Sequence, residues 1–225
     1  MPRGVAGAGG LIVLALLALP LAGCAQPPTD TPTHAFLAVP SWKVGWSWNY
    51  TLEDGANATV GWVRYTVEAI EPVGNVTDRA YRVKVERYDV GDVDHDGVPN
   101  QTFVRTVHYD AATLNLVWSA CGKPGYFGAC EGRDPELDFP LVDGKGWDSM
   151  SGGDVVIRFV NHATKLPGGP LWRVTRSAPD VGWQPRVDLF DASVGFYRER
   201  RMLGGSSTQP GVEPEVWTLQ ARPVL

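Results

Sequence analysis

The sequence is poor in the residues on which catalysis, metal binding and nucleic-acid binding most often depend. Among its 225 residues it has three cysteines, four histidines and three methionines. Its 20 lysines and arginines are outnumbered by 25 aspartates and glutamates, which gives a net charge of −5. A protein that binds nucleic acid needs a surplus of basic residues to neutralise phosphates, so we expect no nucleic-acid partner.

Long hydrophobic runs and helical periodicity are also lacking. The apolar run at residues 11–19 is too short to cross a bilayer as a helix. No segment longer than ten residues repeats its apolar residues with a period of 3.6. A hydrophobic fraction of 44% with 20% charged residues is typical of a folded domain. These features exclude a polytopic membrane protein, a collagen-like fibre and a disordered tail.

Motifs for nucleophilic or metal-assisted catalysis are absent as well. The sequence contains no G-x-S-x-G, S-x-x-K or H-E-x-x-H pattern. The turn at residues 204–208 lacks the lysine of a phosphate-binding loop. Asp188 and Asp191 could serve a glycosidase as paired carboxylates, but such pairs are common. We therefore expect a protein that is not an enzyme, and an envelope hydrolase is the second alternative to the function given below.

The first 24 residues carry an export signal. A single charge, Arg3, precedes the apolar run, which ends in Leu21-Ala22-Gly23-Cys24. Small residues directly before a cysteine resemble the bacterial and archaeal lipobox, in which the cysteine is lipidated and becomes the N-terminus. We expect residues 1–23 to be a signal peptide and Cys24 to anchor the chain at the cell surface, on the outer face of the cytoplasmic membrane. An ordinary secretory signal is the alternative.

Residues 24–41 are rich in proline and threonine and show no apolar periodicity at first, so the lipidated cysteine is followed by a tether. The remaining residues, 42–225, are expected to form a single domain. Cys121 and Cys130 are the remaining cysteines, nine positions apart around a turn-rich segment. In an exported protein such a pair is typical of a disulfide, and a metal or redox pair is less expected because no C-x-x-C spacing is present.

Four of the six asparagines stand in Asn-x-Ser/Thr sequons, namely Asn49, Asn57, Asn75 and Asn100. Chance predicts about 0.6 such sites. The excess favours a glycosylated surface protein and, because many archaea glycosylate this sequon at their surface, an archaeal source. The alternative is that asparagine and threonine both gather at turns and strand edges.

From residue 42 onward the chain reads as a succession of strands. Trp46, Trp48 and Tyr50 alternate with polar residues, which is the period-two pattern of a half-buried strand. Further strands are expected near residues 58–71, 80–90, 101–109, 114–118, 153–161, 170–178, 185–190, 195–203 and 214–222. Their short spacing, without helices between them, predicts an all-β fold: a large curved antiparallel sheet, a half-barrel or a sandwich, with little helix.

A family resemblance rests on several segments in the same order. Val44-Gly45-Trp46-Ser-Trp48-Asn-Tyr50 resembles a V-G-x-x-W-x-Y strand, and the segment at 139–147 resembles an F-P-L-x-x-G-x-x-W element. Residues 191–198 and 216–219 resemble a later turn and the closing strand. Together they resemble uncharacterised exported lipoproteins that look like the LolA/LolB half-barrel carriers. The resemblance implies a curved sheet that covers a hydrophobic cavity.

The segment Asp92-Val-Asp94-His-Asp96-Gly97 matches the first half of a calcium loop, and Asn100 falls at the ninth position. Carboxylates at alternate positions could face a hard cation. The twelfth position is Phe103, where an EF-hand needs glutamate, and no flanking helices are expected. A calcium-bound hairpin and an acidic, soluble hairpin tip both remain open, and Ca²⁺ is the one cofactor to consider.

Nine tryptophans are the remaining feature. Trp46, Trp48, Tyr50 and Trp62 are candidates to line a concave face that binds an apolar ligand. The alternative is that these rings fill the core.

We expect a monomeric, non-catalytic lipoprotein that binds an apolar or amphipathic ligand or shields an envelope protein. The main alternative is a structural or adhesive, glycosylated module of the envelope.

Overall fold

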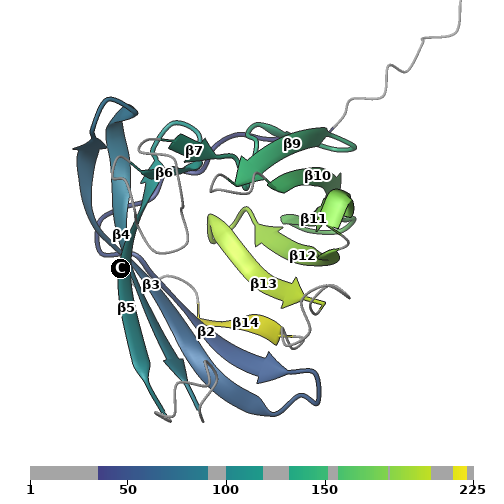
Figure 1. Cartoon of the computed structure of the whole chain (residues 1–225). Coiled ribbons are helices and arrows are strands. Elements are labelled where there is room, and N and C mark those ends of the chain that lie inside the picture. Colours follow the sequence, from purple (N-terminus) through teal and green to yellow (C-terminus); the bar gives the residue numbers. More distant parts are fainter. Residues whose placement is uncertain are drawn as a thin grey trace, which may run out of the picture. The chain divides into compact units, whose positions relative to one another are not determined.

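Most of the described chain belongs to one large antiparallel sheet of twelve strands (Figure 1). The computed structural model describes residues 35–90, 100–118, 132–151, 157–181, 183–203 and 215–221. Within these ranges there is no α-helix, and the helical structure is limited to the 3-10 turn η1 at Pro179–Val181. The expected all-β fold, a large curved antiparallel sheet with little helix, is confirmed.

The strands are short at the edges of the sheet and long in its first half. Their bounds are β1 (Phe36–Leu37), β2 (Ser47–Asp54), β3 (Thr59–Val73), β4 (Thr77–Asp89), β5 (Thr102–Asp110), β6 (Leu116–Trp118), β7 (Gly132–Asp134), β8 (Leu141–Val142), β9 (Gly146–Ser151), β10 (Ile157–Lys165), β11 (Leu171–Ala178), β12 (Trp183–Asp191), β13 (Phe196–Met202) and β14 (Glu215–Ala221).

The sheet consists of two meanders that are joined in its middle. Strands β2 to β7 follow one another in the first meander, and β9 to β14 follow one another in the second. The joint is the pairing of β14 with β2, in which Trp217 lies opposite Leu52. Figure 1 shows the long strands β2 to β5 on one side and β10 to β13 across from them.

The two edge strands, β7 and β9, come into contact without closing a barrel. No ladder joins them in the residues that the structure describes. Instead, Trp147 of β9 donates a hydrogen bond from Nε1 to the carbonyl oxygen of Pro135, just after β7, over 2.8 Å. A separate pair, β1 with β8, forms a two-stranded sheet.

One face of the sheet carries the core, because side chains alternate along each strand. On β2, Trp48, Tyr50 and Leu52 are buried at every second position. Their ladder partners on β3 include Tyr65 and Val63, which are also buried. We call this buried face the inner face of the sheet and the opposite one the outer face.

Trp42, which precedes β2, is the centre of the aromatic core. Its ring lies 5.0–5.3 Å from the rings of four other aromatic residues, Trp48, Tyr81, Tyr109 and Phe196. Its Nε1 donates a hydrogen bond to the carbonyl oxygen of Gly195 over 2.8 Å. Edge-on and tilted ring contacts of this kind stabilise a core beyond the area that they bury.

A glycine fixes the close approach of β3 to β4. A Cβ atom at Gly61 would lie 2.1 Å from the backbone carbonyl oxygen of Tyr88, a distance that no side chain can adopt. Gly61 stands opposite Asp89 in the ladder. The absence of a side chain at this position is therefore a requirement of the strand pairing.

The described part of the chain contains no helix with the length and apolar character needed to cross a membrane.

Candidate functional site

The aromatic residues that the sequence predicts to line a ligand site divide between the two faces of the sheet. Trp48 and Tyr50 lie on the inner face and are buried in the aromatic core. Trp48 Nε1 donates to the carbonyl oxygen of Val194 over 3.0 Å, and the Tyr50 hydroxyl donates to that of Tyr197 over 2.6 Å. These hydrogen bonds therefore hold both side chains against the second meander.

The other two predicted rings lie nearer to solvent. Trp46 is half-buried and packs edge-on against Trp48, with ring centroids 6.1 Å apart. Trp62 lies on the outer face, where its ring stacks with that of Tyr88 and the Arg64 guanidinium lies over it. A role of any of these rings in ligand binding stays a prediction.

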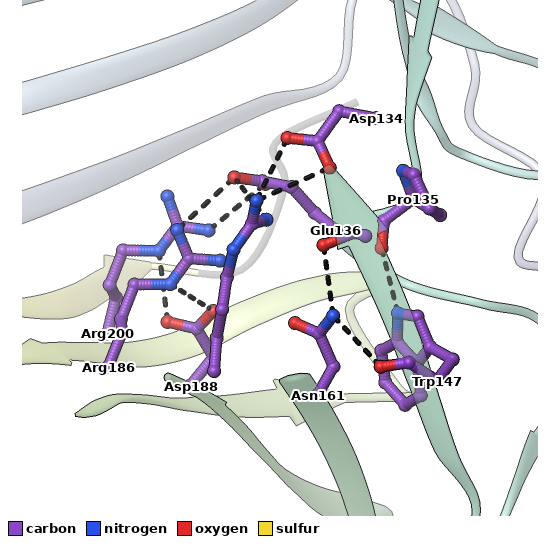
Figure 2. Close-up of polar contacts among 10 residues, drawn as sticks. Asp134, Pro135, Glu136, Trp147, Asn161, Arg186, Asp188 and Arg200 are labelled. Atoms are coloured by element: carbon purple, nitrogen blue, oxygen red, sulfur yellow. Dashed lines mark hydrogen bonds and ion pairs between the residues drawn. The ribbon is translucent and has the colours of Figure 1, made fainter. Parts of the chain in front are cut away.

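Next to the aromatic core, six charged side chains contact one another on the inner face. They comprise three arginines and three carboxylates, which we call the charged cluster: Asp134, Glu136, Arg176, Arg186, Asp188 and Arg200. Arg176, Arg186 and Arg200 come from the neighbouring strands β11, β12 and β13. Figure 2 shows Glu136 facing Arg186 and Arg200.

Glu136 is the centre of the charged cluster. Arg186 Nη1 donates to Glu136 Oε1 over 3.2 Å, and Arg200 Nη2 donates to Glu136 Oε2 over 3.5 Å. Arg176 Nη1 lies 3.7 Å from Glu136 Oε1, while Arg176 Nη2 donates to Asp134 Oδ2 over 3.1 Å. Guanidinium groups from three strands therefore surround one carboxylate.

Asp188 is the second anion on which two arginines meet, and it is almost completely buried. Arg200 Nε donates to Asp188 Oδ1 over 3.0 Å. Arg186 Nε lies 2.9 Å from Asp188 Oδ2, but the two groups are not aligned as a hydrogen bond. The cluster is thus a chain of alternating charges with three of each sign.

The ladder explains why a carboxylate is needed at the position of Glu136. Arg176 of β11 stands directly opposite Arg186 of β12. Like charges directly opposite each other destabilise a pair of strands, whereas opposite charges stabilise it. Asp188 and Arg200 are an opposite-charge pair of this kind on β12 and β13. Glu136, from the segment after β7, supplies the charge that the two facing arginines lack.

The pKa values of Glu136 and of Asp134, the last residue of β7, are shifted in opposite directions. Burial would raise the pKa of Glu136, but the three guanidinium groups around it outweigh burial and hold the pKa far below its usual range. For Asp134 burial dominates, and its pKa is raised despite the contact with Arg176. Glu136 is therefore an anion throughout the neutral range.

A smaller ionic group borders the charged cluster on the inner face. Arg87 Nε donates to Asp89 Oδ1 over 2.8 Å, and its Nη2 donates to Glu215 Oε2 over 3.1 Å. Both groups contact the Trp217 ring, with the Arg87 and Arg200 guanidinium carbons 5.9 and 5.5 Å from its centroid. The polar part of the inner face thus continues onto the first meander.

Part of the inner face on β5 is exposed. In the ladder, Phe103 and Arg105 stand opposite Arg87 and Val85, so they share the inner face. Both are exposed, Phe103 by 41%. Arg105 has no ion pair with any residue in the described ranges. An exposed ring and an exposed cation therefore lie side by side on a face that is elsewhere buried.

Several predicted sites lie outside the described residues. These are the lipidated Cys24, the predicted disulfide Cys121 and Cys130, and the carboxylates Asp92, Asp94 and Asp96 of the predicted calcium loop. Asn100, the last residue of that loop, is described, exposed and has a positive φ of 60°. Among the described residues no group of three histidines, cysteines or acidic residues could hold a metal ion.

The four predicted glycosylation sites are all described. Asn57, Asn75 and Asn100 are exposed, and Asn57 and Asn75 lie in turns or next to them. Asn49 is half-buried on the outer face, where its Oδ1 accepts a hydrogen bond from Arg64 Nε over 2.8 Å. Glycosylation at these four positions stays a prediction.

The carboxylates Asp188 and Asp191 point in different directions. They are three residues apart on β12, so their side chains lie on opposite faces of the strand. Asp188 belongs to the charged cluster, whereas Asp191 Oδ1 accepts hydrogen bonds from the backbone N–H and the hydroxyl of Ser193. The structure does not bring these two carboxylates together.

No motif in the sequence indicates the charged cluster. One signal is present on β12, where Arg186 falls at the same alternate positions as the buried Phe190. The partner Glu136 lies in an irregular segment, and no pattern links it to those strands.

Comparison of the chain with protein-family models, with curated proteins and with solved structures gives no match. The resemblance to the LolA/LolB-like carriers stays a prediction, and the inner face must be interpreted from its own chemistry.

Proposed function

We propose that this protein is a cell-surface lipoprotein, anchored through Cys24 to the outer face of the cytoplasmic membrane, whose β-domain binds an amphipathic ligand on its inner face. The role is non-catalytic and the protein acts as a monomer. The observation that carries this proposal is the exposed part of the inner face, where Phe103 and Arg105 stand next to each other on β5.

An amphipathic ligand fits this face because apolar and charged groups adjoin on it. The Phe103 ring offers apolar surface, and contact with a hydrocarbon chain would remove that surface from water. The Arg105 guanidinium and the neighbouring charged groups offer donors to a polar head. Ligand pockets in proteins commonly combine a mostly apolar lining with a few polar groups that fix orientation.

The test is native mass spectrometry of the full-length chain purified from its natural host. We expect a non-covalent amphipathic mass that is lost on denaturation. Phe103→Asp should abolish it, because a carboxylate at this position would have to lose its hydration when an apolar chain covers it. The matched control is Val104→Asp, since Val104 is the next residue on β5, is 59% exposed and lies on the outer face. The absence of any bound mass, or equal loss in both variants, would contradict the proposal.

A second candidate is a structural or adhesive, glycosylated module of the envelope. The observation that favours it is the exposure of Asn57, Asn75 and Asn100. The same mass spectra test it, because glycans add covalent mass that survives denaturation. Glycan mass at these sites together with no bound ligand would favour the module over the binding protein.

A further inference from the structure

The charged cluster has the composition of an anion site whose occupant is part of the chain. Three guanidinium groups on adjacent strands converge on the carboxylate of Glu136. Arginines present several N–H donors in a planar fork that matches the oxygens of a carboxylate or a phosphate. Glu136 uses only part of that capacity.

Three buried donor groups of the cluster have no hydrogen-bond acceptor in the described part of the chain. One is Arg176 Nη1, and the Arg176 side chain is only 7% exposed. The other two are Arg186 Nε and Arg186 Nη2. A buried donor without a partner destabilises the folded chain, so an additional oxygen next to these groups would be stabilising. Both arginines already face Glu136 Oε1, so the unused donors belong to the same site.

The arginines and their anion are held in different ways. Arg176, Arg186 and Arg200 stand in hydrogen-bonded ladders, which fix their backbones. Glu136 stands in the irregular segment 135–140, which we call the strap. Apolar contacts of the strap with the core, such as Phe139 on Phe190, hold it in place, but no ladder includes it.

We propose that the three arginines form an anion-binding subsite, that Glu136 is its resting occupant, and that the oxyanion head group of the ligand, a carboxylate or a phosphate, replaces Glu136. This inference rests on the proposed function, since it names the head group of the amphipathic ligand. The charge balance of the cluster favours a ligand anion that replaces Glu136 over one that binds in addition to it. The cluster holds three positive and three negative groups, and a further buried anion would leave it with an uncompensated charge.

The test is calorimetric titration of the full-length chain with three probes: dodecanoate, which has a head and a chain; dodecanol, which has the chain alone; and acetate, which has the head alone. For the wild-type protein we expect dodecanoate to bind at least about tenfold tighter than dodecanol, because only dodecanoate can use the arginines. Equal affinities would overturn the subsite.

Glu136→Gln removes the resting occupant. In the wild-type protein the ligand can bind only while Glu136 is away from the arginines, which lowers the apparent affinity. The variant should therefore bind dodecanoate about tenfold tighter than wild type. Dodecanol should bind both proteins equally. The matched control is Glu199→Gln, since Glu199 pairs with Arg201 on the outer face of β13. It should leave every affinity unchanged. No gain in Glu136→Gln would overturn the replacement.

The outcomes separate the two proposals. If no probe binds the wild-type protein, the proposed function fails. If dodecanol binds as well as dodecanoate, the function stands and the subsite fails. If acetate binds as tightly as dodecanoate, the subsite is supported and its ligand is a free anion. The wild-type comparison of dodecanoate with dodecanol needs no variant, so it tests the anion-binding subsite even if Glu136→Gln does not fold.

Discussion

Arg200 and Asp188 stand directly opposite each other on β13 and β12, and the arginine donates from Nε to Oδ1 of the aspartate over 3.0 Å. The pair is buried, with 11% of the Arg200 side chain and 1% of the Asp188 side chain exposed. Removal of one partner of such a pair leaves an uncompensated charge in the interior, which is more costly than the loss of the contact itself.

Asp188→Asn should therefore lower the free energy of unfolding by about 3–5 kcal/mol. The matched control is Asp148→Asn, which breaks an arginine–aspartate contact of 2.7 Å between Arg158 and Asp148 where both side chains are about half exposed. The control should cost much less than Asp188→Asn, because water screens an exposed ion pair. Urea unfolding at neutral pH measures both. Similar losses in the two variants would mean that the cluster is solvated.

Acid should destabilise the protein through Glu136. Its pKa in the folded state is held below the value of about 4.3 that it has in an unfolded chain. The unfolded chain therefore binds the proton more tightly, so the stabilisation is complete above about pH 5 and is lost as the pH falls toward the folded-state pKa. In Glu136→Gln this loss should disappear, and unfolding curves between pH 7 and pH 3 should show a flatter dependence.

Asp134 provides a control, because its pKa is shifted in the opposite direction to that of Glu136. Burial raises its folded-state pKa, so its charged form opposes folding above the unfolded-state value and this effect fades as the pH falls. Asp134→Asn should make the loss of stability in acid steeper than in the wild-type protein. A flatter profile for Asp134→Asn would contradict the assignment of the two carboxylates.

Gly61→Ala should destabilise the sheet severely. The new Cβ would lie 2.1 Å from the Tyr88 carbonyl oxygen, and backbone atoms of β4 would have to move. We expect a loss of more than about 3 kcal/mol in urea unfolding, as for a strained core substitution. Gly146→Ala is the control in a strand, because its Cβ would meet only the Asn161 carbonyl oxygen at 3.6 Å. A small change for Gly61→Ala would mean that β3 and β4 can separate locally.

Two tryptophans should respond differently to truncation. Trp48 is completely buried, whereas Trp62 is 37% exposed on the outer face. Trp48→Ala should lower the free energy of unfolding by about 3–5 kcal/mol, and Trp62→Ala by less than about 1.5 kcal/mol. Thermal or urea unfolding measures both. Equal losses would place the two rings in equivalent surroundings and contradict the assignment of faces.

The strand pattern could be predicted from alternation wherever the inner face is apolar. The strand expected at 170–178 is β11 at Leu171–Ala178, and that expected at 195–203 is β13 at Phe196–Met202. The strand expected near 153–161 corresponds to β10 at Ile157–Lys165, which continues four residues further than expected.

Strand β9 was not predicted, because one of its inner positions is polar. Ser149 is buried there and its hydroxyl accepts a hydrogen bond from Asn161 Nδ2 of β10 over 3.0 Å. Without apolar alternation a strand of this kind has no signature in the sequence. The same reason hid the charged cluster, since charged residues in a strand usually indicate its solvent face. The countercharge that these inner-face arginines need comes from Glu136, which is distant from them in the sequence.

The pairing of β14 with β2 also affects how the chain can acquire its structure during synthesis. The first meander can assemble as soon as β2 to β7 have been made, but one side of β2 then presents unpaired backbone groups. Those groups receive their partner only when Glu215–Ala221 emerges, more than 160 residues later. Such distant pairing is slow to form. A nascent chain therefore exposes the unpaired edge of β2 until Glu215–Ala221 has been made.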